Sequence, residues 1–318
     1  MRFRAVLNKD GGTLRTMDLD AFCARAAEIF TQAGHAFDHR VVAGAEVAEA
    51  LQAAADDQGV EAVIAGGGDG TISTAAGIAF ASGKPLGVLP AGTMNLFARA
   101  LGMPPDLDKA VEALARGQIE QIDIATANGR PFVHQFGVGI HARLVRIRDS
   151  MDYSSRLGKM FASLRAIAAA AVDPPRFEVE LESPKGRVSR TASGIAVSNN
   201  PLDNGPIPVA ERLDSGLLGV YVASSVSSRE LLNLAVDVLV GRWRGNPAVS
   251  ETEVPELVLY FPKRKRGSHA VLDGELIALD REVELRIHPR ALAVVRPVSG
   301  GNGENAGEAE PNPHTHVH

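Results

Sequence analysis

Short apolar runs alternate with segments of helical periodicity from the start of the chain to about residue 118. Each apolar run has the length of a buried strand and ends near a loop rich in glycine, asparagine or proline. The pattern predicts strands at 3–7, 37–42, 60–65 and 86–89, and helices at 19–30, 47–55, 71–82, 93–101 and 107–116. Strands that alternate with helices form a parallel sheet covered on both faces, and such sheets bind ligands beyond the carboxyl ends of their strands.

Strand-like runs dominate the rest of the chain. The predicted strands lie at 121–126, 131–138, 176–181, 187–197, 217–222, 256–261, 270–272, 282–287 and 291–295, with helices at 155–172 and 228–240. This pattern is typical of a mostly antiparallel β domain with inserted helices. We therefore predict an α/β domain at 1–124, a mostly antiparallel β-sandwich domain at 125–298, and a disordered tail at 299–318.

The composition narrows the class of protein. A chain of 318 residues is long enough for two cores, and a net charge of −5 argues against a nucleic-acid-binding protein. The single Cys23 rules out an intrachain disulfide, argues against a zinc site built from cysteines and fits a reducing compartment. Because the sequence offers neither an apolar signal core nor a run of 18 apolar residues, we expect a cytoplasmic protein.

The tail carries His314, His316 and His318 at alternate positions. Three such side chains could bind a metal ion. We favour the interpretation of a solvated tail, because the surrounding glycine, glutamate, asparagine and proline residues cannot build a rigid site.

A glycine-rich turn joins the predicted strand at 60–65 to the helix that follows it. Backbone N–H groups in such a turn, together with the positive end of the helix dipole, suit an anion and most often a phosphate. The turn is neither a P-loop nor a dinucleotide fingerprint, because Gly70 is followed by Thr71 and Ile72. Asp69 would there hold a cation or its water, or accept a hydrogen bond from the turn. A plain strand-to-helix turn remains the alternative.

A second loop, at 89–104, follows the next predicted strand. Gly92 and Thr93 would open a helix, so that their N–H groups and the threonine hydroxyl can meet a second phosphate. Asn95 offers an amide to a ribose, a phosphate or the neighbouring loop. Thr93 as an ordinary N-cap is the alternative. A third loop, at 8–12, ends the first strand and should meet the other two at the same sheet edge.

Two carboxylates flank a glycine far downstream, in the segment Asp273-Gly274-Glu275. One carboxylate can take a proton from a hydroxyl while the other orients it or helps to hold a cation. The alternative is an ordinary Asp-Gly hairpin turn between two strands.

Together these motifs resemble the diacylglycerol kinase catalytic family, which includes bacterial lipid kinases and the sphingosine and ceramide kinases. The resemblance rests on Gly-Gly-Asp-Gly-Thr at 67–71, Gly-Thr-x-Asn-x-Phe-Ala-Arg at 92–99 and Asp-Gly-Glu at 273–275, and it covers about residues 2–297. It implies an α/β domain of the kind found in NAD kinases and diacylglycerol kinases, joined to a β-sandwich. It also implies transfer of the γ-phosphate of ATP, with Mg²⁺, to a lipid hydroxyl in the cleft between the domains.

The resemblance also assigns roles to residues. Glu275 matches the usual proton acceptor, and Asp273 is the other candidate; we count Asp69 with them as catalytic. The residues expected to bind ATP are Asn8, Gly66, Gly67, Gly68, Asp69, Gly70, Thr71, Gly92, Thr93 and Asn95.

The chain departs from the family pattern at several positions. Lys9 replaces a proline, Ser73-Thr74 replace Asn-Glu, Leu96 replaces an aspartate, and 41–44 lack a threonine that often meets the nucleotide. Ser215 replaces the aspartate that helps to bind a structural Mg²⁺ in the family, which leaves the adjacent Asp214 as the candidate metal ligand.

A lipid kinase of this kind implies a lipid substrate at a membrane surface, here the inner face. Two basic clusters could contact such a surface, Lys263–Arg266 and Arg242–Arg244 with Trp243. A solvated loop and a packed tryptophan are the alternatives, and the apolar stripe at 155–172 indicates core packing more than a lipid groove. The sequence leaves the oligomeric state open, with a homodimer among the options.

Two other functions share parts of the pattern. NAD kinases and phosphofructokinases also carry a Gly-Gly-Asp-Gly turn, so a soluble acceptor is an alternative. A non-enzymatic nucleotide-binding sensor of the same fold is another, because acids of the family pattern are missing.

Overall fold

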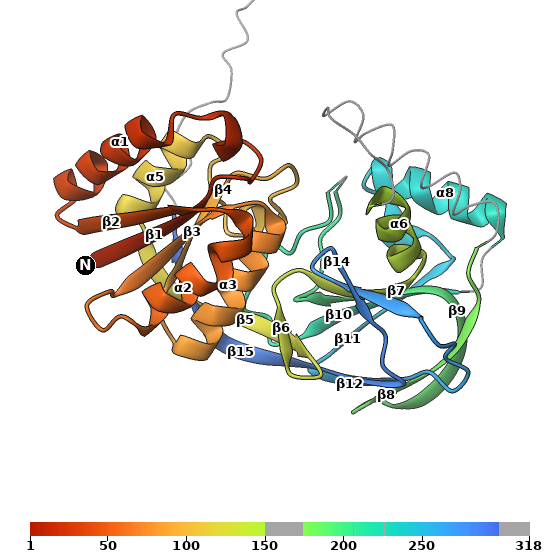
Figure 1. The fold of residues 1–318 in the computed structure, drawn as a ribbon. Helices are drawn as coiled ribbons and strands as arrows, with labels where there is room; N and C mark the ends of the chain where they lie inside the picture. Colours follow the sequence, from red (N-terminus) through yellow and green to blue (C-terminus); the bar gives the residue numbers. More distant parts are fainter. Residues whose placement is uncertain (150–173, 206, 225–226, 299–318) are drawn as a thin grey trace, which may run out of the picture.

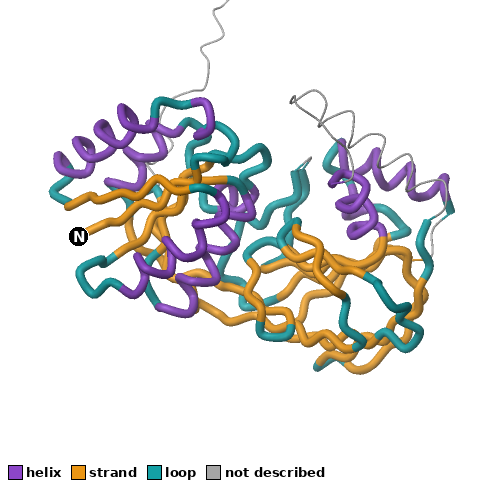
Figure 2. Tube along the Cα trace, in the orientation of Figure 1, coloured by secondary structure: helices purple, strands orange, loops and turns teal. Residues whose placement is uncertain are grey.

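The computed structural model describes residues 1–149, 174–205, 207–224 and 227–298. The helix predicted at 155–172 and the tail predicted at 299–318 lie outside these residues. The described chain forms two lobes, shown at the left and right of Figure 1, with helices packed on the first sheet and strands dominating the second lobe (Figure 2).

The first lobe is a parallel sheet in the strand order β2-β1-β3-β4. Its strands are β1 (Arg2–Asn8), β2 (Ala36–Val42), β3 (Ala62–Gly67) and β4 (Leu86–Pro90). Its helices are α1 (Leu19–Gln32), α2 (Val47–Asp56), α3 (Asp69–Ser82), α4 (Leu96–Ala100) and α5 (Leu107–Ala115). Every residue of β3 and β4 is buried, because α1 and α5 cover one face of the sheet and α2 and α3 the other (Figure 1).

The second lobe is mostly antiparallel. Its strands follow the order β14-β13-β7-β9-β8-β12-β15, with β10 and β11 added at β9. They are β6 (Arg130–Phe132), β7 (Gln135–Gly139), β8 (Phe177–Ser183), β9 (Gly186–Asn199), β10 (Leu218–Ser224), β11 (Val249–Val254), β12 (Glu256–Tyr260), β13 (His269–Leu272) and β14 (Glu275–Ala278). Among the described residues, two α-helices belong to this lobe, α6 (Ile140–Asp149) and α8 (Ser228–Leu239). The fold class predicted from the sequence is confirmed.

Two long strands, β5 (Gln118–Ala127) and β15 (Glu282–Arg296), pair with each other and run from one lobe into the other (Figure 1). The hydrophobic core of the first lobe includes Ile124, whereas Ala125 packs in the core of the second. On β15, Leu285 packs in the second core and Leu292 in the first. The end of the described chain therefore returns to the first lobe, within the range predicted as one domain at 125–298; the domain limits themselves stay a prediction.

Several element boundaries differ from those predicted. β3 continues to Gly67 and α3 begins at Asp69, because Gly66 and Gly67 still pair with β4. The helix predicted at 93–101 begins only at Leu96. The strand predicted at 131–138 is interrupted between β6 and β7, and the strands predicted at 282–287 and 291–295 form one strand, β15. Neither α6 nor β11 was predicted.

Trp243 is not an interfacial residue. Its side chain is buried and packs edge-on against Tyr221 at 5.0 Å between ring centroids. The neighbouring Arg244 forms an ion pair with Glu251. Among the described residues, no helix combines the length and apolar content needed to span a membrane.

Candidate active site

Three loops at the carboxyl ends of β1, β3 and β4 are joined by backbone hydrogen bonds. The N–H of Thr13 donates to the carbonyl of Ala91 at 2.9 Å, and the N–H of Ala91 donates to the carbonyl of Gly67 at 3.0 Å. The packing admits no side chain at Gly12, where a Cβ would lie 1.8 Å from the carbonyl oxygen of Ala91. We call these loops and the first turn of α3 the glycine-loop wall of the site.

The N-terminus of α3 has no side-chain cap at Gly68. The nearest carboxylate, that of Asp69, instead accepts hydrogen bonds from the backbone N–H groups of Asn95 at 3.1 Å and Leu96 at 2.7 Å. Asp69 therefore ties the first glycine turn to the start of α4. A helix N-terminus without a side-chain cap leaves its first N–H groups to an anion, so the wall has the chemistry of a phosphate site.

The second loop closes on itself through Asn95, the N-cap residue of α4, which has a φ of 50°. Its side-chain oxygen accepts from the N–H of Gly92 at 2.8 Å and its amide group donates to the Gly92 carbonyl at 3.1 Å. The prediction that Gly92 and Thr93 open a helix is wrong, because α4 begins after this closed turn and Thr93 lies in the exposed loop before it. The Asn95 amide was expected to meet a ribose, a phosphate or the neighbouring loop. In the structure its side chain contacts Gly92 of the same loop.

The first loop reaches the glycine turn through Asn8. Its amide donates to the Thr71 hydroxyl at 3.1 Å, and its side-chain oxygen accepts from the N–H of Asp10 at 3.1 Å. Gly67 lies against the same threonine, since a Cβ there would be 2.6 Å from Thr71 Cβ. Gly66 lies inside β3, where a Cβ would be 2.5 Å from a methyl group of Leu7. The structure thus gives Gly66 a packing role in the sheet.

The second lobe supplies the opposite side of the site, which we call the Glu275 wall. Asp273 and Gly274 form a two-residue hairpin turn between β13 and β14, with φ values of 46° and 87°. Positive φ at both residues is the signature of the turn that matches strand twist. The backbone therefore forms the Asp-Gly hairpin turn that was the alternative interpretation of this segment. This turn determines where the carboxylates of Asp273 and Glu275 point.

The Asp273 carboxylate accepts four hydrogen bonds. Three come from the backbone N–H groups of Val133, His134 and Gln135 at 2.9, 2.9 and 3.0 Å, and one from the Ser73 hydroxyl at 2.8 Å. Desolvation raises the pKa of the Asp273 carboxyl above its ordinary value, while these hydrogen bonds act in the opposite direction. With its oxygens engaged, Asp273 holds the turn against α3.

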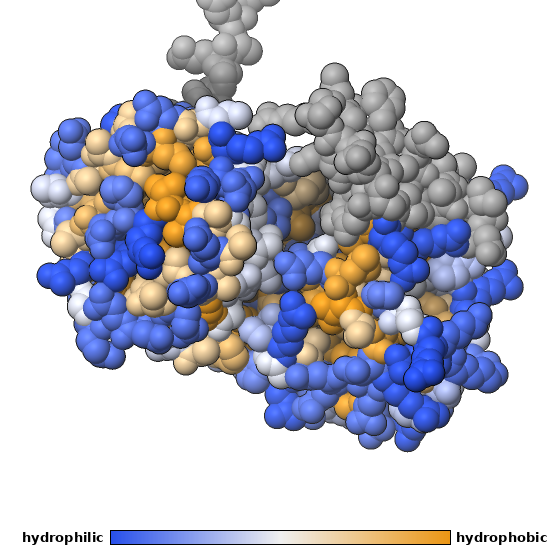
Figure 3. Space-filling view, viewed as in Figure 1, coloured by the Kyte–Doolittle hydropathy of each residue, from blue (hydrophilic) through white to orange (hydrophobic). Residues whose placement is uncertain are grey.

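Glu275 faces the glycine-loop wall. A Cβ built on Gly70, in the first turn of α3, would lie 3.3 Å from Oε1 of Glu275. The other oxygen of Glu275 lies 3.3 Å from Nη2 of Arg130, and the glutamate side chain is 57% exposed. The space-filling view shows the surface recessed between the two lobes (Figure 3). A carboxylate that is open to solvent thus lies beside a helix N-terminus suited to phosphate.

Three residues of this site were not assigned roles from the sequence. Arg130 places a positive charge beside Glu275, and Ser73 connects α3 to the Asp273 turn. Desolvation lowers the pKa of His134 to about 4, against the attraction of the Asp69 carboxylate, so this ring is neutral at pH 7. No local sequence motif identifies Arg130 or His134 as site residues. Ser73 could have been identified, because it departs from the family pattern.

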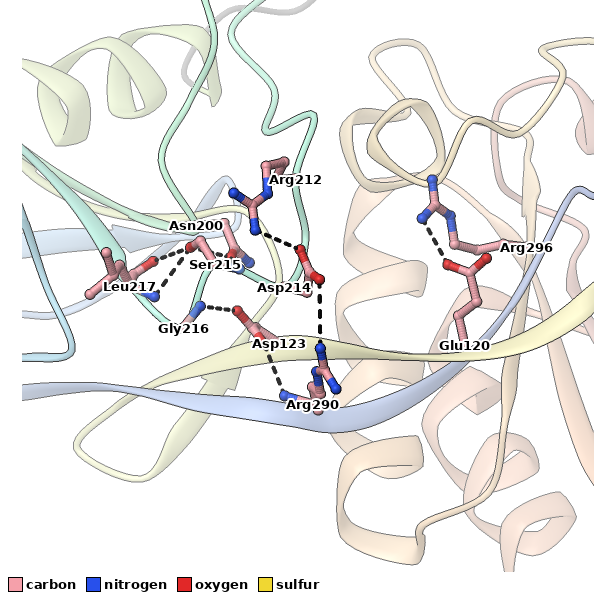
Figure 4. Close-up of polar contacts among 10 residues, drawn as sticks. All are labelled: Glu120, Asp123, Asn200, Arg212, Asp214, Ser215, Gly216, Leu217, Arg290 and Arg296. Carbon is pink, nitrogen blue, oxygen red and sulfur yellow. Dashed lines mark hydrogen bonds and ion pairs between the residues drawn. The ribbon is translucent and has the colours of Figure 1, made fainter. Parts of the chain in front are cut away.

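Asp214 does not join other acids. It pairs with Arg212 at 3.5 Å and lies 4.0 Å from Nη2 of Arg290, as Figure 4 shows. Within the described parts of the chain, no group of three or more His, Cys, Asp or Glu side chains is placed to hold a metal ion. A metal ion at Asp214 therefore stays a prediction.

Several polar groups next to Asp214 form hydrogen bonds with one another. Asp123 accepts from the N–H groups of Gly216 at 2.7 Å and Arg290 at 2.9 Å. The Ser215 hydroxyl donates to the side-chain oxygen of Asn200 at 2.7 Å (Figure 4). The oxygens of Asp123 and Asn200 are thus engaged by protein donors, whereas the buried side-chain oxygen of Asn199 has no hydrogen-bond partner. The structural Mg²⁺ that the resemblance implies stays a prediction.

Comparison with known proteins identifies the family. A family model described as the diacylglycerol kinase catalytic domain matches residues 2–127. A protein of Yersinia enterocolitica described as a "Probable lipid kinase YegS-like" is 39% identical over 240 residues, which cover 73% of this chain and 78% of that protein. The chain belongs to the diacylglycerol kinase catalytic family. The resemblance inferred from the sequence motifs is thereby confirmed.

The chain is also similar to two further bacterial proteins and to a solved structure. A Bacillus subtilis protein named diacylglycerol kinase is 25% identical over 279 residues, covering 82% of this chain and 89% of that protein. An uncharacterized Synechocystis protein is 31% identical, and the match spans only 56% of its length. A solved structure named as a diacylglycerol kinase from Bacillus anthracis superposes with a TM-score of 0.69 at 16% identity, covering 93% of this chain and 96% of that one. That likeness shows the fold.

Proposed function

We propose that this chain is an ATP-dependent lipid kinase that transfers the γ-phosphate of ATP to a lipid hydroxyl. The observation that supports this proposal most strongly is the contact between the two walls, with Glu275 Oε1 3.3 Å from the Cβ position of Gly70. A phosphate on the α3 N-terminus would lie next to a carboxylate able to receive the acceptor's proton. The family supports the same donor and acceptor classes.

Each residue of the site has a defined task in this proposal. The N–H groups of Gly70 and Thr71 bind the triphosphate, and Asp69 keeps the second loop against them. Glu275 takes the proton from the lipid hydroxyl while the oxygen of that hydroxyl forms a bond to the γ-phosphorus. The bond from the γ-phosphorus to the oxygen that bridges it to the β-phosphorus breaks, which releases ADP. Arg130 neutralises charge beside Glu275.

The donor set at the cleft fits a Mg²⁺ that arrives with the nucleotide. The described residues form no cage of acids, so most of the ligands would be phosphate oxygens and water. When bound, the ion neutralises charge on the phosphates. The protein's own part is to position the two substrates and to accept the proton.

A phosphotransfer assay with γ-labelled ATP, Mg²⁺ and mixed micelles tests the proposal. The acceptor array should contain diacylglycerol, ceramide and a sphingoid base, with NAD as the soluble alternative. We expect label in one lipid product and none in NADP. Binding of ATP without turnover on any lipid would contradict the proposal and favour a nucleotide sensor, whereas label in NADP would point to a soluble acceptor.

A further inference from the structure

A second groove, of about 1090 Å³, lies in the second lobe away from the glycine loops. Its lining includes apolar side chains, among them Val138, Phe177 and Phe261. Seven lysine and arginine side chains also line it, four of them in the run Lys263–Arg266 between β12 and β13. The groove therefore combines apolar area with a concentration of positive charge.

Among the described residues that line the groove, Glu178 is the one acidic side chain, and it pairs with Lys263 at 2.6 Å. Arg264 donates to the carbonyl of Leu279 at 2.7 Å, which fixes the loop against the strands, while Lys265 and Arg266 are exposed. In a chain with a net charge of −5, such a local excess of cations marks a surface for an anionic partner.

The groove and the Glu275 wall lie at opposite ends of the same pair of strands. β13 runs from His269, which lines the groove, to Leu272, which precedes the Asp273 turn. Its antiparallel neighbour β7 runs the other way and ends at Gly139, also in the groove. At about 3.3 Å per residue, a four-residue strand places the two sites roughly 10 Å apart. Arg146 of α6 donates to His269 Nδ1 at 2.9 Å, which holds that helix at the groove end of β13.

We propose that this groove, which we call the basic groove, is the surface by which the protein docks on a bilayer containing anionic phospholipid. Exposed lysine and arginine side chains attract lipid phosphates, and the apolar lining accommodates the glycerol and upper acyl region. This inference rests on the proposed function in one respect, which is that the bilayer supplies the lipid hydroxyl to Glu275. Docking itself requires no turnover.

Vesicle co-sedimentation tests this proposal. The wild-type protein should bind vesicles of equal parts phosphatidylcholine and phosphatidylglycerol, bind pure phosphatidylcholine far less, and lose binding at high salt. The double variant Lys265→Ala/Arg266→Ala should bind the mixed vesicles roughly 30-fold more weakly, about fivefold per side chain. The matched control Lys109→Ala/Arg116→Ala removes the same charge from exposed positions on and just after α5 and should bind as the wild type does.

Two outcomes would overturn the docking proposal: equal binding to both vesicle types by the wild type, or equal losses in the two double variants. Phosphorylation of lipid in neutral detergent micelles separates this failure from failure of the kinase proposal. Lys265→Ala/Arg266→Ala should keep wild-type turnover there, since neither side chain belongs to the site. Loss of turnover in micelles would show that these residues act in catalysis and not in docking.

Discussion

The two sides of the cleft are built by different means. The glycine-loop wall consists of backbone held at close approach, and its carboxylate, Asp69, is engaged by N–H groups of the next loop. The Glu275 wall depends on one solvent-exposed side chain on a hairpin that Asp273 holds in place. In the proposed reaction, binding of the nucleotide would therefore be distributed over many groups, whereas proton transfer would depend on one.

The largest effect is expected at Glu275. Glu275→Gln keeps the shape of the side chain but removes the base, so turnover should fall by about 10²–10⁴-fold. Affinity for ATP, measured by calorimetry, should change little, because the nucleotide is held by the other wall. Wild-type turnover by this variant would show that proton transfer does not depend on Glu275.

Asp69 should act through the loop that it holds. Asp69→Asn replaces one accepting oxygen with a donor facing an N–H group, at a cost of about 1.5–3 kcal/mol for a charge-assisted hydrogen bond. We expect ATP affinity to fall by roughly 10- to 100-fold. The kcat of the enzyme saturated with ATP should fall by a smaller factor. Asp214→Asn, a change of the same type at a carboxylate that pairs with Arg212 and Arg290, is the control. A defect confined to kcat would instead make Asp69 catalytic.

Gly92 tests the backbone packing of the glycine-loop wall. A Cβ at this position would lie 2.8 Å from Gly68 Cα and 2.8 Å from the Asn95 side-chain oxygen. Gly92→Ala should therefore push the loops apart at a cost of about 1–2 kcal/mol, seen as weaker ATP binding. Gly245→Ala, with no atom within 4 Å of the new Cβ, should behave as the wild type does.

His134 lies between the walls and should make stability depend on pH. Its folded-state pKa of about 4 is below the unfolded value of 6.5, so the unfolded chain binds the proton more tightly. The stabilisation is present above pH 6.5 and is lost as the pH falls towards 4. We expect a loss on the order of 1–2 kcal/mol, allowing for solvent screening of a partly exposed ring. Thermal unfolding of His134→Asn should show a smaller loss over this interval; identical curves would exclude this ring as the source.

The sequence predicted the parts of this molecule that depend on local pattern. The glycine turns could be found because glycine at 67 and 92 reflects a close approach that a larger residue does not allow. Helical and strand periodicity placed most of the elements of the first lobe, because buried strands there alternate with helices that bury one face.

The parts that could not be predicted depend on contacts between distant segments. Asp69 meets Asn95, and Glu275 meets Arg130, across 26 and 145 positions of the chain. The start of α4 shifted from Thr93 to Leu96 because the Asn95 side chain closes the preceding turn. The ion pairs of Asp214 with Arg212 and with Arg290 on β15 could not be predicted either, and a metal at Asp214 stays a prediction.

A crystal structure with a non-hydrolysable ATP analogue and Mg²⁺ tests the central claim most directly. We expect the β- and γ-phosphates on the N–H groups of Gly70 and Thr71, with the γ-phosphorus facing the Glu275 carboxylate across the cleft. A triphosphate bound elsewhere, or one whose γ-phosphate points away from Glu275, would contradict it.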